Sequence, residues 1–233
     1  MYRPIRGRLL GYKYDVEEFV GRIAEYRRMS RNRTRFDRTA IEDLVGRIRE
    51  ESELLLNAGE ACLLFSCVKN TAKVPGDLAE VGVYKGGSAK IICEAKGDRS
   101  LDLFDTFEGI PSIDRGLDGN VFKEGQYAAS LEEVKRYLDR YPMMHYYKGR
   151  FPLTAGPVKE KVFSFVNLDV DTHDSTWSCL EFFYPRMHSG GLILCHDYCD
   201  GVPGVKSAVD RFFEDKAEPI IEISGFHGIV GKI

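Results

Sequence analysis

The stretch Leu78-Ala-Glu80-Val-Gly82-Val-Tyr84-Lys-Gly86-Gly87-Ser88 decides the fold, because it reads as a buried strand, a glycine turn and the start of a helix. Glycines in such a turn tolerate positive φ and carry no Cβ, so the backbone can approach a ligand and direct free N–H groups at it. A dinucleotide fingerprint needs glycine where Tyr84 stands, and a P-loop needs Lys-Ser/Thr after its last glycine. Neither pattern is present.

The remaining ligand for such a turn is S-adenosylmethionine, which has no phosphates and presents a carboxylate, an ammonium group and a ribose. A strand-to-helix turn of another α/β protein is the alternative reading of this segment alone. If the turn holds the cofactor, the residues expected to contact it are Glu80, Gly82, Tyr84, Gly86, Gly87 and Ser88.

Composition restricts the class of protein. The 233 residues are 43% hydrophobic and 30% charged, enough for one sizeable core plus an extension. The net charge of −3 gives no reason to expect nucleic acid as a partner, and an arginine-rich stretch over 27–38 favours a solvated helix face or a contact with another subunit. With no signal segment and no apolar run long enough for a bilayer, we expect a cytoplasmic protein whose six cysteines are reduced.

The hydrophobic pattern predicts helices first and then an alternation of strands and helices. Apolar residues recur with helical spacing over 14–29, 40–57 and 58–71. Strands are then predicted at 78–82, 100–105, 144–148, 162–168 and 192–195, helices at 87–96, 130–141, 175–187 and 204–215, and a terminal hairpin at 218–223 and 228–233. This order predicts an α/β protein with a mostly parallel sheet and one antiparallel strand from the hairpin. The helical extension would cover residues 1–75, and the α/β domain 76–233.

Ligands of open parallel sheets bind at the carboxyl ends of the strands, so the residues that follow each strand are candidates. Asp105 follows the second strand, where a carboxylate can accept both hydrogen bonds of a ribose diol; an N-cap is the alternative. Phe107 would wall the adenine or belong to the core, and Gly149 follows the third strand. The long loop 106–128 holds four glycines and is predicted to close over the donor.

Acidic residues cluster after the fourth and fifth strands. Asp169, Asp171 and Asp197 would repel one another unless a cation or protons intervened, and with His196 they would suit Mg²⁺ or, because of the imidazole, Mn²⁺. The alternatives are that Asp169 only contacts the cosubstrate and that His196 is a core histidine. A zinc site at Cys195 and Cys199 is disfavoured, because Cys195 ends an apolar strand and points away from its neighbour.

Taken together, these residues resemble the macrocin and mycinamicin O-methyltransferases, a family that is metal-dependent and acts on antibiotic sugars. The resemblance spans roughly 76–215. The matching segments are Pro75-Gly-Asp-Leu-Ala-Glu-Val-Gly-Val-Tyr-Lys-Gly-Gly87, Asp105-Thr-Phe-Glu-Gly-Ile-Pro111, Ser130-Leu-Glu-Glu-Val134, Leu168-Asp-Val-Asp-Thr-His-Asp-Ser-Thr176, Tyr184-Pro185, Gly190-Gly191, His196-Asp-Tyr198 and Pro203-Gly-Val-Lys-Ser-Ala-Val-Asp210.

The resemblance implies a class I methyltransferase fold with a seven-stranded sheet, S-adenosylmethionine as methyl donor, and a metal held by Asp169, His196 and Asp197. His196 departs from the family pattern, which has Asp or Glu there, so the site loses one negative charge. The acceptor would be a hydroxyl of a small molecule such as a sugar, and the N-terminal helices would mediate homo-oligomerisation.

In the mechanism that we expect, the sulfonium methyl moves to a hydroxyl oxygen while a carboxylate removes its proton. Asp169 and Asp171 are the candidate bases, with His173 a weaker one. Three rivals stay open at this point: a metal-independent methyltransferase with a histidine base, a nucleoside-binding module without catalysis, and a nicotinamide dehydrogenase.

Overall fold

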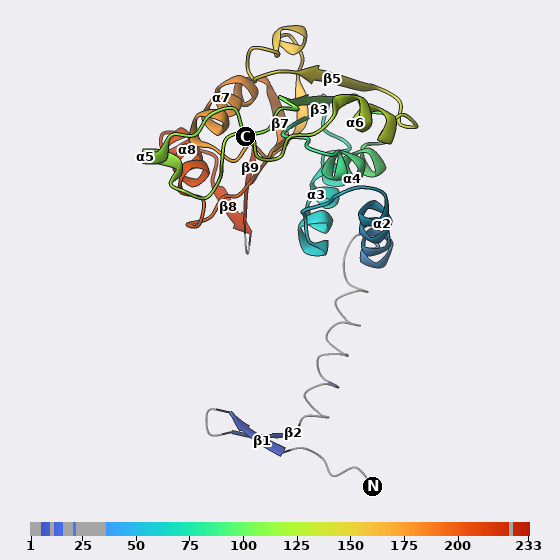
Figure 1. The fold of residues 1–233 in the computed structure, drawn as a ribbon, viewed down its shortest axis with the longest axis vertical. Coiled ribbons are helices and arrows are strands. Elements are labelled where there is room, and N and C mark those ends of the chain that lie inside the picture. Colours follow the sequence, from blue (N-terminus) through green and yellow to red (C-terminus); the bar gives the residue numbers. More distant parts are fainter. Residues whose placement is uncertain (1–5, 10–11, 16–20, 22–35, 224–225) are drawn as a thin grey trace. The chain divides into compact units, whose positions relative to one another are not determined.

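The computed structural model describes residues 6–9, 12–15, 21, 36–223 and 226–233, and Figure 1 shows the chain. It forms two units, 1–43 and 44–233. In the first unit, β1 (Arg6–Leu9) and β2 (Tyr12–Asp15) pair antiparallel. The helix predicted for 14–29 is therefore wrong at residues 14 and 15, whose backbone groups pair across the hairpin. Apart from residue 21, which is helical, the rest of that helix lies outside the described residues.

Two helices precede the sheet, α2 (Arg38–Glu51) and α3 (Ala58–Asn70). The second begins at a capping box, in which the side chain of Asn57 accepts hydrogen bonds from the N–H groups of Gly59 and Glu60, and the Glu60 carboxylate accepts one from Asn57 N. The helix predicted for 40–57 therefore ends early. The segment 52–57 contacts the glycine turn instead, where Ser52 Oγ donates to Lys85 O at 3.1 Å.

A seven-stranded sheet forms the centre of the second unit, in the order β5-β4-β3-β6-β7-β9-β8. Its strands are β3 (Asp77–Val81), β4 (Leu101–Asp105), β5 (Met144–Lys148), β6 (Phe163–Leu168), β7 (Met187–His196), β8 (Ile220–Ile223) and β9 (His227–Gly231). The first five pair in parallel, and β9 runs antiparallel to both of its neighbours. This arrangement confirms the predicted fold class.

Helices cover both faces of this sheet, because successive strand residues point to opposite sides. On one face, Leu78 and Leu103 pack with α2, α3, α4 (Gly87–Lys96) and α6 (Leu131–Tyr137). On the other face, Val81 and Phe104 pack with α7 (His173–Phe183) and α8 (Pro203–Phe213). The remaining short helices are α5 (Arg115–Asp118), η1 (Gly156–Val158) and η2 (Tyr184–Arg186). Within the described part of the chain, no helix has the length and apolar character needed to cross a membrane.

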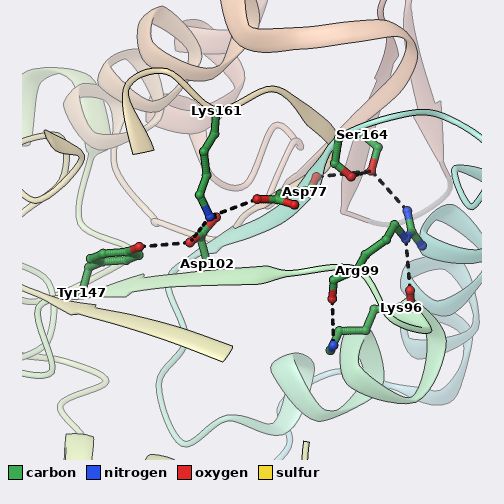
Figure 2. Close-up of polar contacts among 8 residues, drawn as sticks. Asp77, Lys96, Arg99, Asp102, Tyr147, Lys161 and Ser164 are labelled. Carbon is green, nitrogen blue, oxygen red and sulfur yellow. Dashed lines mark hydrogen bonds and ion pairs between the residues drawn. The ribbon is translucent and has the colours of Figure 1, made fainter. Parts of the chain in front are cut away.

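A polar cluster stabilises the amino-terminal ends of the central strands (Figure 2). The Asp102 side chain on β4 is fully buried and accepts hydrogen bonds from Lys161 Nζ, at 2.8 and 3.0 Å, and from the Tyr147 hydroxyl at 3.1 Å. Lys161 also pairs with Asp77 at 3.0 Å. Because ligands bind at the opposite, carboxyl ends of the strands, this cluster can stabilise the sheet without taking part in the chemistry.

A second ion pair closes the terminal hairpin. Glu218 accepts hydrogen bonds from Lys232 Nζ at 2.6 Å and from the Tyr184 hydroxyl at 2.9 Å. Burial tends to raise the pKa of Glu218, but the hydrogen bonds from Lys232 and Tyr184 outweigh it and lower the pKa to about 2.

Candidate active site

A cavity of about 250 Å³ opens at the carboxyl ends of β3, β4, β6 and β7. Its wall contains ten of the residues predicted from the sequence. These are Gly82, Tyr84, Gly87, Ser88, Asp105, Gly149, Asp169, Asp171, His196 and Asp197. The topology brings them together because β3 and β6 are neighbours in the sheet whose connections leave in opposite directions, and such a point leaves a crevice between the loops.

The glycine turn is held against the strand that carries the acidic residues. Gly82 has φ +89°, and a Cβ built on it would lie 1.8 Å from the carbonyl oxygen of Asp169. A side chain cannot be accommodated there. Gly87 opens α4 and packs under Leu54, whose Cδ1 would lie 2.9 Å from an added Cβ. The turn therefore fixes the position of Asp169 as well as forming part of the cavity.

Asp105 organises the same turn. Its Oδ2 accepts hydrogen bonds from the backbone N–H groups of Val83 (2.7 Å) and Tyr84 (2.8 Å), and its Oδ1 accepts one from Phe107 N at 2.6 Å. The expectation that the glycine turn directs free N–H groups at a ligand is therefore wrong at residues 83 and 84. The Asp105 carboxylate still lines the cavity; its Oδ2 already accepts two hydrogen bonds, so the lone pair left to accept from a ribose hydroxyl is on Oδ1.

Four predicted residues lie outside the cavity wall. Phe107 is 5% exposed and belongs to the core on the α4 face, because its hydrogen bond to Asp105 turns the chain inward at φ +56°. Gly86 precedes α4 and approaches side chains of α6. His173 is the first residue of α7, with its ring stacked on Trp177 at 6.3 Å. The adenine wall predicted at Phe107 is thus corrected to a core position.

Glu80, the fourth of these residues, is fully buried beneath the turn. Its Oε1 accepts a hydrogen bond from Asn167 Nδ2 at 2.9 Å, and its Oε2 has no hydrogen-bond partner. Burial raises the pKa of Glu80 to about 8, although the nearby polar groups of Ser88 and Asn167 oppose this shift. The side chain therefore carries a proton over much of the neutral range.

Asp169, His196 and Asp197 form a cluster whose ligand atoms all lie within 4.8 Å of one another. His196 Nδ1 lies 3.3 Å from Asp169 Oδ1 and 3.2 Å from Asp197 Oδ1. Burial lowers the pKa of His196, but the two carboxylates outweigh it and raise the pKa to about 10. Burial also raises the pKa of Asp169 and Asp171, and the neighbouring carboxylates add to the effect.

The cluster has the donors of a metal site. Both ring nitrogens of His196 are buried without a hydrogen-bond partner, and the nearby carboxylate oxygens repel one another unless a cation or proton separates them. Carboxylate oxygens with one imidazole nitrogen fit a divalent ion with affinity for nitrogen, such as Mn²⁺, at least as well as Mg²⁺. His227 on β9 lies edge-on to His196, with ring centroids 4.5 Å apart, and burial lowers its pKa to about 4.

Part of the cavity wall was not foreseen. Glu53, Leu55 and Leu56 line the cavity because the chain leaves α2 at residue 51 and passes along the turn. Leu55 is 59% exposed and lies at this wall. The signal that could have located this segment is the capping box at Asn57 and Glu60, which requires a helix to start there and the preceding one to end.

Another part of the wall comes from the loop 106–128, whose individual lining residues were not predicted. Ile110, Phe122 and Tyr127 line the cavity from this loop. The Tyr127 ring packs edge-on against Tyr84 with centroids 5.6 Å apart. Apolar and aromatic groups therefore share the cavity wall with the acidic cluster.

Comparison with known proteins identifies the protein family to which this chain belongs. Residues 62–228 match the macrocin-O-methyltransferase (TylF) family. The chain is 28% identical over 215 residues to demethyldecarbamoylnovobiocin O-methyltransferase of Streptomyces niveus, covering 84% of this chain and 77% of that protein. It is 29% identical over 178 residues to mycinamicin III 3''-O-methyltransferase of Micromonospora griseorubida, covering 67% and 69%. Among solved structures, the O-methyltransferase NovP superimposes with a TM-score of 0.66 at 28% identity, over 78% of this chain and 82% of that one.

Proposed function

Because the chain belongs to the macrocin-O-methyltransferase family and is an S-adenosylmethionine-dependent O-methyltransferase, we propose that it methylates a hydroxyl of a sugar on a glycosylated small molecule with the help of a divalent metal. The part of this proposal that concerns the metal and the acceptor rests on one observation. Asp169, His196 and Asp197 converge in the cavity that also contains Asp105. By their names, the two similar enzymes O-methylate demethyldecarbamoylnovobiocin and mycinamicin III, which supports a small-molecule hydroxyl as the acceptor.

The donor is assigned to the part of the cavity formed by the glycine turn and β4. Asp105 would accept the ribose hydroxyls, with Tyr84, Gly87 and Ser88 against the amino-acid end and Gly149 near the base. Leu55 would contact the acceptor, since an apolar side chain exposed at a cavity needs a partner with an apolar face.

The metal would be held by Asp169, His196 and Asp197. When bound, it would lower the pKa of the acceptor hydroxyl and orient its oxygen. Asp171 is the proposed base, because its carboxylate lines the cavity beside the cluster. His173 is a poorer candidate than expected, since its ring stacks on Trp177 outside the cavity wall.

A metal-independent reaction is the second candidate, and the charge of His196 favours one form of it. With a pKa of about 10, His196 is an imidazolium ion at neutral pH when no metal is bound, and it can offset part of the negative charge of Asp169 and Asp197. It would then not be the base, and Asp171 would have to act alone.

Self-association of the chain remains a prediction, to be measured by light scattering of the purified protein.

Titration calorimetry with S-adenosylhomocysteine, with and without Mn²⁺ or Mg²⁺, tests the donor site. We expect micromolar binding that Asp105→Ala weakens by roughly tenfold to a hundredfold, since hydrogen bonds to a charged group contribute about 1.5–3 kcal/mol. No binding to the wild-type protein under any metal condition would contradict the proposal.

The metal site needs a separate readout. The electron paramagnetic resonance signal of free Mn²⁺ should fall on addition of the wild-type protein, and much less with Asp169→Asn or Asp197→Asn. The matched control is Asp200→Asn, an exposed acid three residues from Asp197. Equal binding by all four proteins, or turnover of an identified acceptor that a chelator leaves unchanged, would favour the metal-independent reaction.

A further inference from the structure

The loop 106–128 is closed at its base. Ile110 N donates to Gln126 O and Gly125 N donates to Ile110 O, both at 2.9 Å. A Cβ on Gly109 would lie 2.4 Å from Gly125 O, so the two ends of the loop are in direct backbone contact. Residues 111–124 form the part of the loop that extends beyond this base, which we call the excursion. The backbone hydrogen bonds at the base do not by themselves fix the position of the excursion.

This excursion contributes Phe122 to the cavity wall, beside Ile110 and Tyr127 at the base of the loop. The rings of Phe122 and Tyr127 pack against each other with centroids 6.4 Å apart. Displacement of the excursion would separate Phe122 from Tyr127 and open that wall to water.

Asp118 attaches the excursion to the rest of the fold. It ends α5, is 4% exposed, and its Oδ1 accepts a hydrogen bond of 2.7 Å from the backbone N–H of His173, the first residue of α7. Its Oδ2 accepts one of 2.9 Å from Asp114 N. The N-cap residue of α7, Thr172, makes no capping hydrogen bond with its own side chain, so Asp118 provides an acceptor that the helix lacks locally.

A second helix, α8, leaves space for the same Asp118 carboxylate in its first turn. A Cβ built on Gly204, in the first turn of α8, would lie 2.1 Å from Asp118 Oδ1. Only glycine leaves room for the carboxylate at that point. The Asp118 side chain therefore occupies a closed seat between the first turns of α7 and α8.

We propose that Asp118 is a positioning residue for methyl transfer, which locks the loop 106–128 onto α7 and α8 and thereby holds both the cavity wall and the turn that carries Asp171. The turn is involved because His173 follows Asp171 by two residues, and Asp171 has φ +64°, a conformation that surrounding contacts must maintain. The part of this inference that concerns Asp171 rests on the proposed function, whereas the part that concerns the loop does not.

Two substitutions test the lock from opposite sides. Asp118→Ala removes the carboxylate, and Gly204→Ala fills its seat while leaving the loop sequence intact. Asp118→Asn keeps an oxygen for His173 N and should rescue part of the effect. The matched control is Asp114→Ala, an exposed acid on the same loop whose side chain caps only Gly116 N.

The first measurement is amide hydrogen exchange of peptides within 109–126 and at the start of α7. Loss of a charge-assisted bond should speed exchange there by roughly tenfold to a hundredfold in Asp118→Ala and Gly204→Ala, and leave Asp114→Ala near the wild-type rate. The dissociation rate of S-adenosylhomocysteine, measured by stopped flow, should rise in the same two variants.

A merely structural role for Asp118 would lower the melting temperature without these local changes. Unchanged loop exchange and an unchanged dissociation rate in both variants would therefore overturn the inference. If the wild-type protein bound no S-adenosylhomocysteine, the proposed function would fail while the exchange measurement still decided whether Asp118 locks the loop.

Discussion

Removal of the ammonium group of Lys161 should cost a large part of the stability of the domain. In Lys161→Met, the Asp102 carboxylate stays fully buried and keeps the hydrogen bond from the Tyr147 hydroxyl at 3.1 Å. Breaking a buried ion pair on one side costs about 3–5 kcal/mol, because an uncompensated charge is left behind. The pair with Asp77, which is one-third exposed, adds at most about 1 kcal/mol.

Urea unfolding at pH 7 measures this cost, with the single tryptophan, Trp177 in α7, as the fluorescent probe. The free energy of unfolding should fall by about 3–5 kcal/mol at unchanged m-value, and the melting temperature by roughly 6–20 °C for a chain of this size. The control Lys159→Met, at an exposed lysine two residues away, should stay within about 0.5 kcal/mol of wild type.

A double variant shows whether the buried charge is the cause. Asp102→Asn in the Lys161→Met background neutralises the stranded carboxylate and should restore about 2 kcal/mol or more. A loss below about 1 kcal/mol in Lys161→Met, or no recovery in the double variant, would refute the reasoning and mean that water or another group solvates Asp102.

Three further predictions concern the turn and the titrating carboxylates. Gly82→Ala should abolish S-adenosylhomocysteine binding in calorimetry and should destabilise the protein more than Gly97→Ala. Both glycines have positive φ, but a Cβ at Gly97 would have open space, whereas a Cβ at Gly82 meets the Asp169 backbone. Equal losses of stability in the two variants would show that φ alone matters. Glu80 has a folded-state pKa of about 8 against 4.5 unfolded, so the native state holds the extra proton between these values and stability should fall as pH rises through them; Glu80→Gln should remove that slope in urea unfolding. Glu218 has the opposite sign, with a folded-state pKa of about 2, so its contribution is complete above pH 4.5 and is lost as pH falls towards 2; thermal melts of Glu218→Gln should differ from wild type at pH 6 and converge on it at low pH.

The strand and helix order could be predicted because local pattern and tertiary structure agree there. The strand at 144–148 and the helix at 87–96 have the predicted bounds, and the residues after the strands meet in one cavity as the topology requires. Prediction failed where distant backbone groups decide the outcome. The strand predicted at 192–195 begins earlier, at Met187, and includes Gly190 and Gly191, because Gly190 N donates to Lys232 O and Lys232 N donates to Gly191 O.

In the candidate site, too, some features could be predicted from the sequence and others depend on distant contacts. Residue types and spacing located the acidic cluster and Asp105, but not the use that Asp105 makes of the turn's N–H groups, since that depends on a 22-residue separation closed by the sheet. Nor does spacing reveal that Phe107 turns into the core, or that His227 comes beside His196. The latter contact exists only because β9 pairs with β7 in a register that places the two histidines opposite each other.

The ion pairs at Lys161 and the candidate site at Asp169 lie at opposite ends of the sheet strands, and this separation has a practical consequence for laboratory evolution. Libraries that vary Leu55 and the tip of the loop 106–128 would alter which acceptors bind while leaving Asp102 and its partners untouched. Most activity losses in such libraries would then report on acceptor fit and not on misfolding. The scaffold is therefore suited to searches for new small-molecule acceptors, because such substitutions leave unaltered the interactions that keep each variant folded.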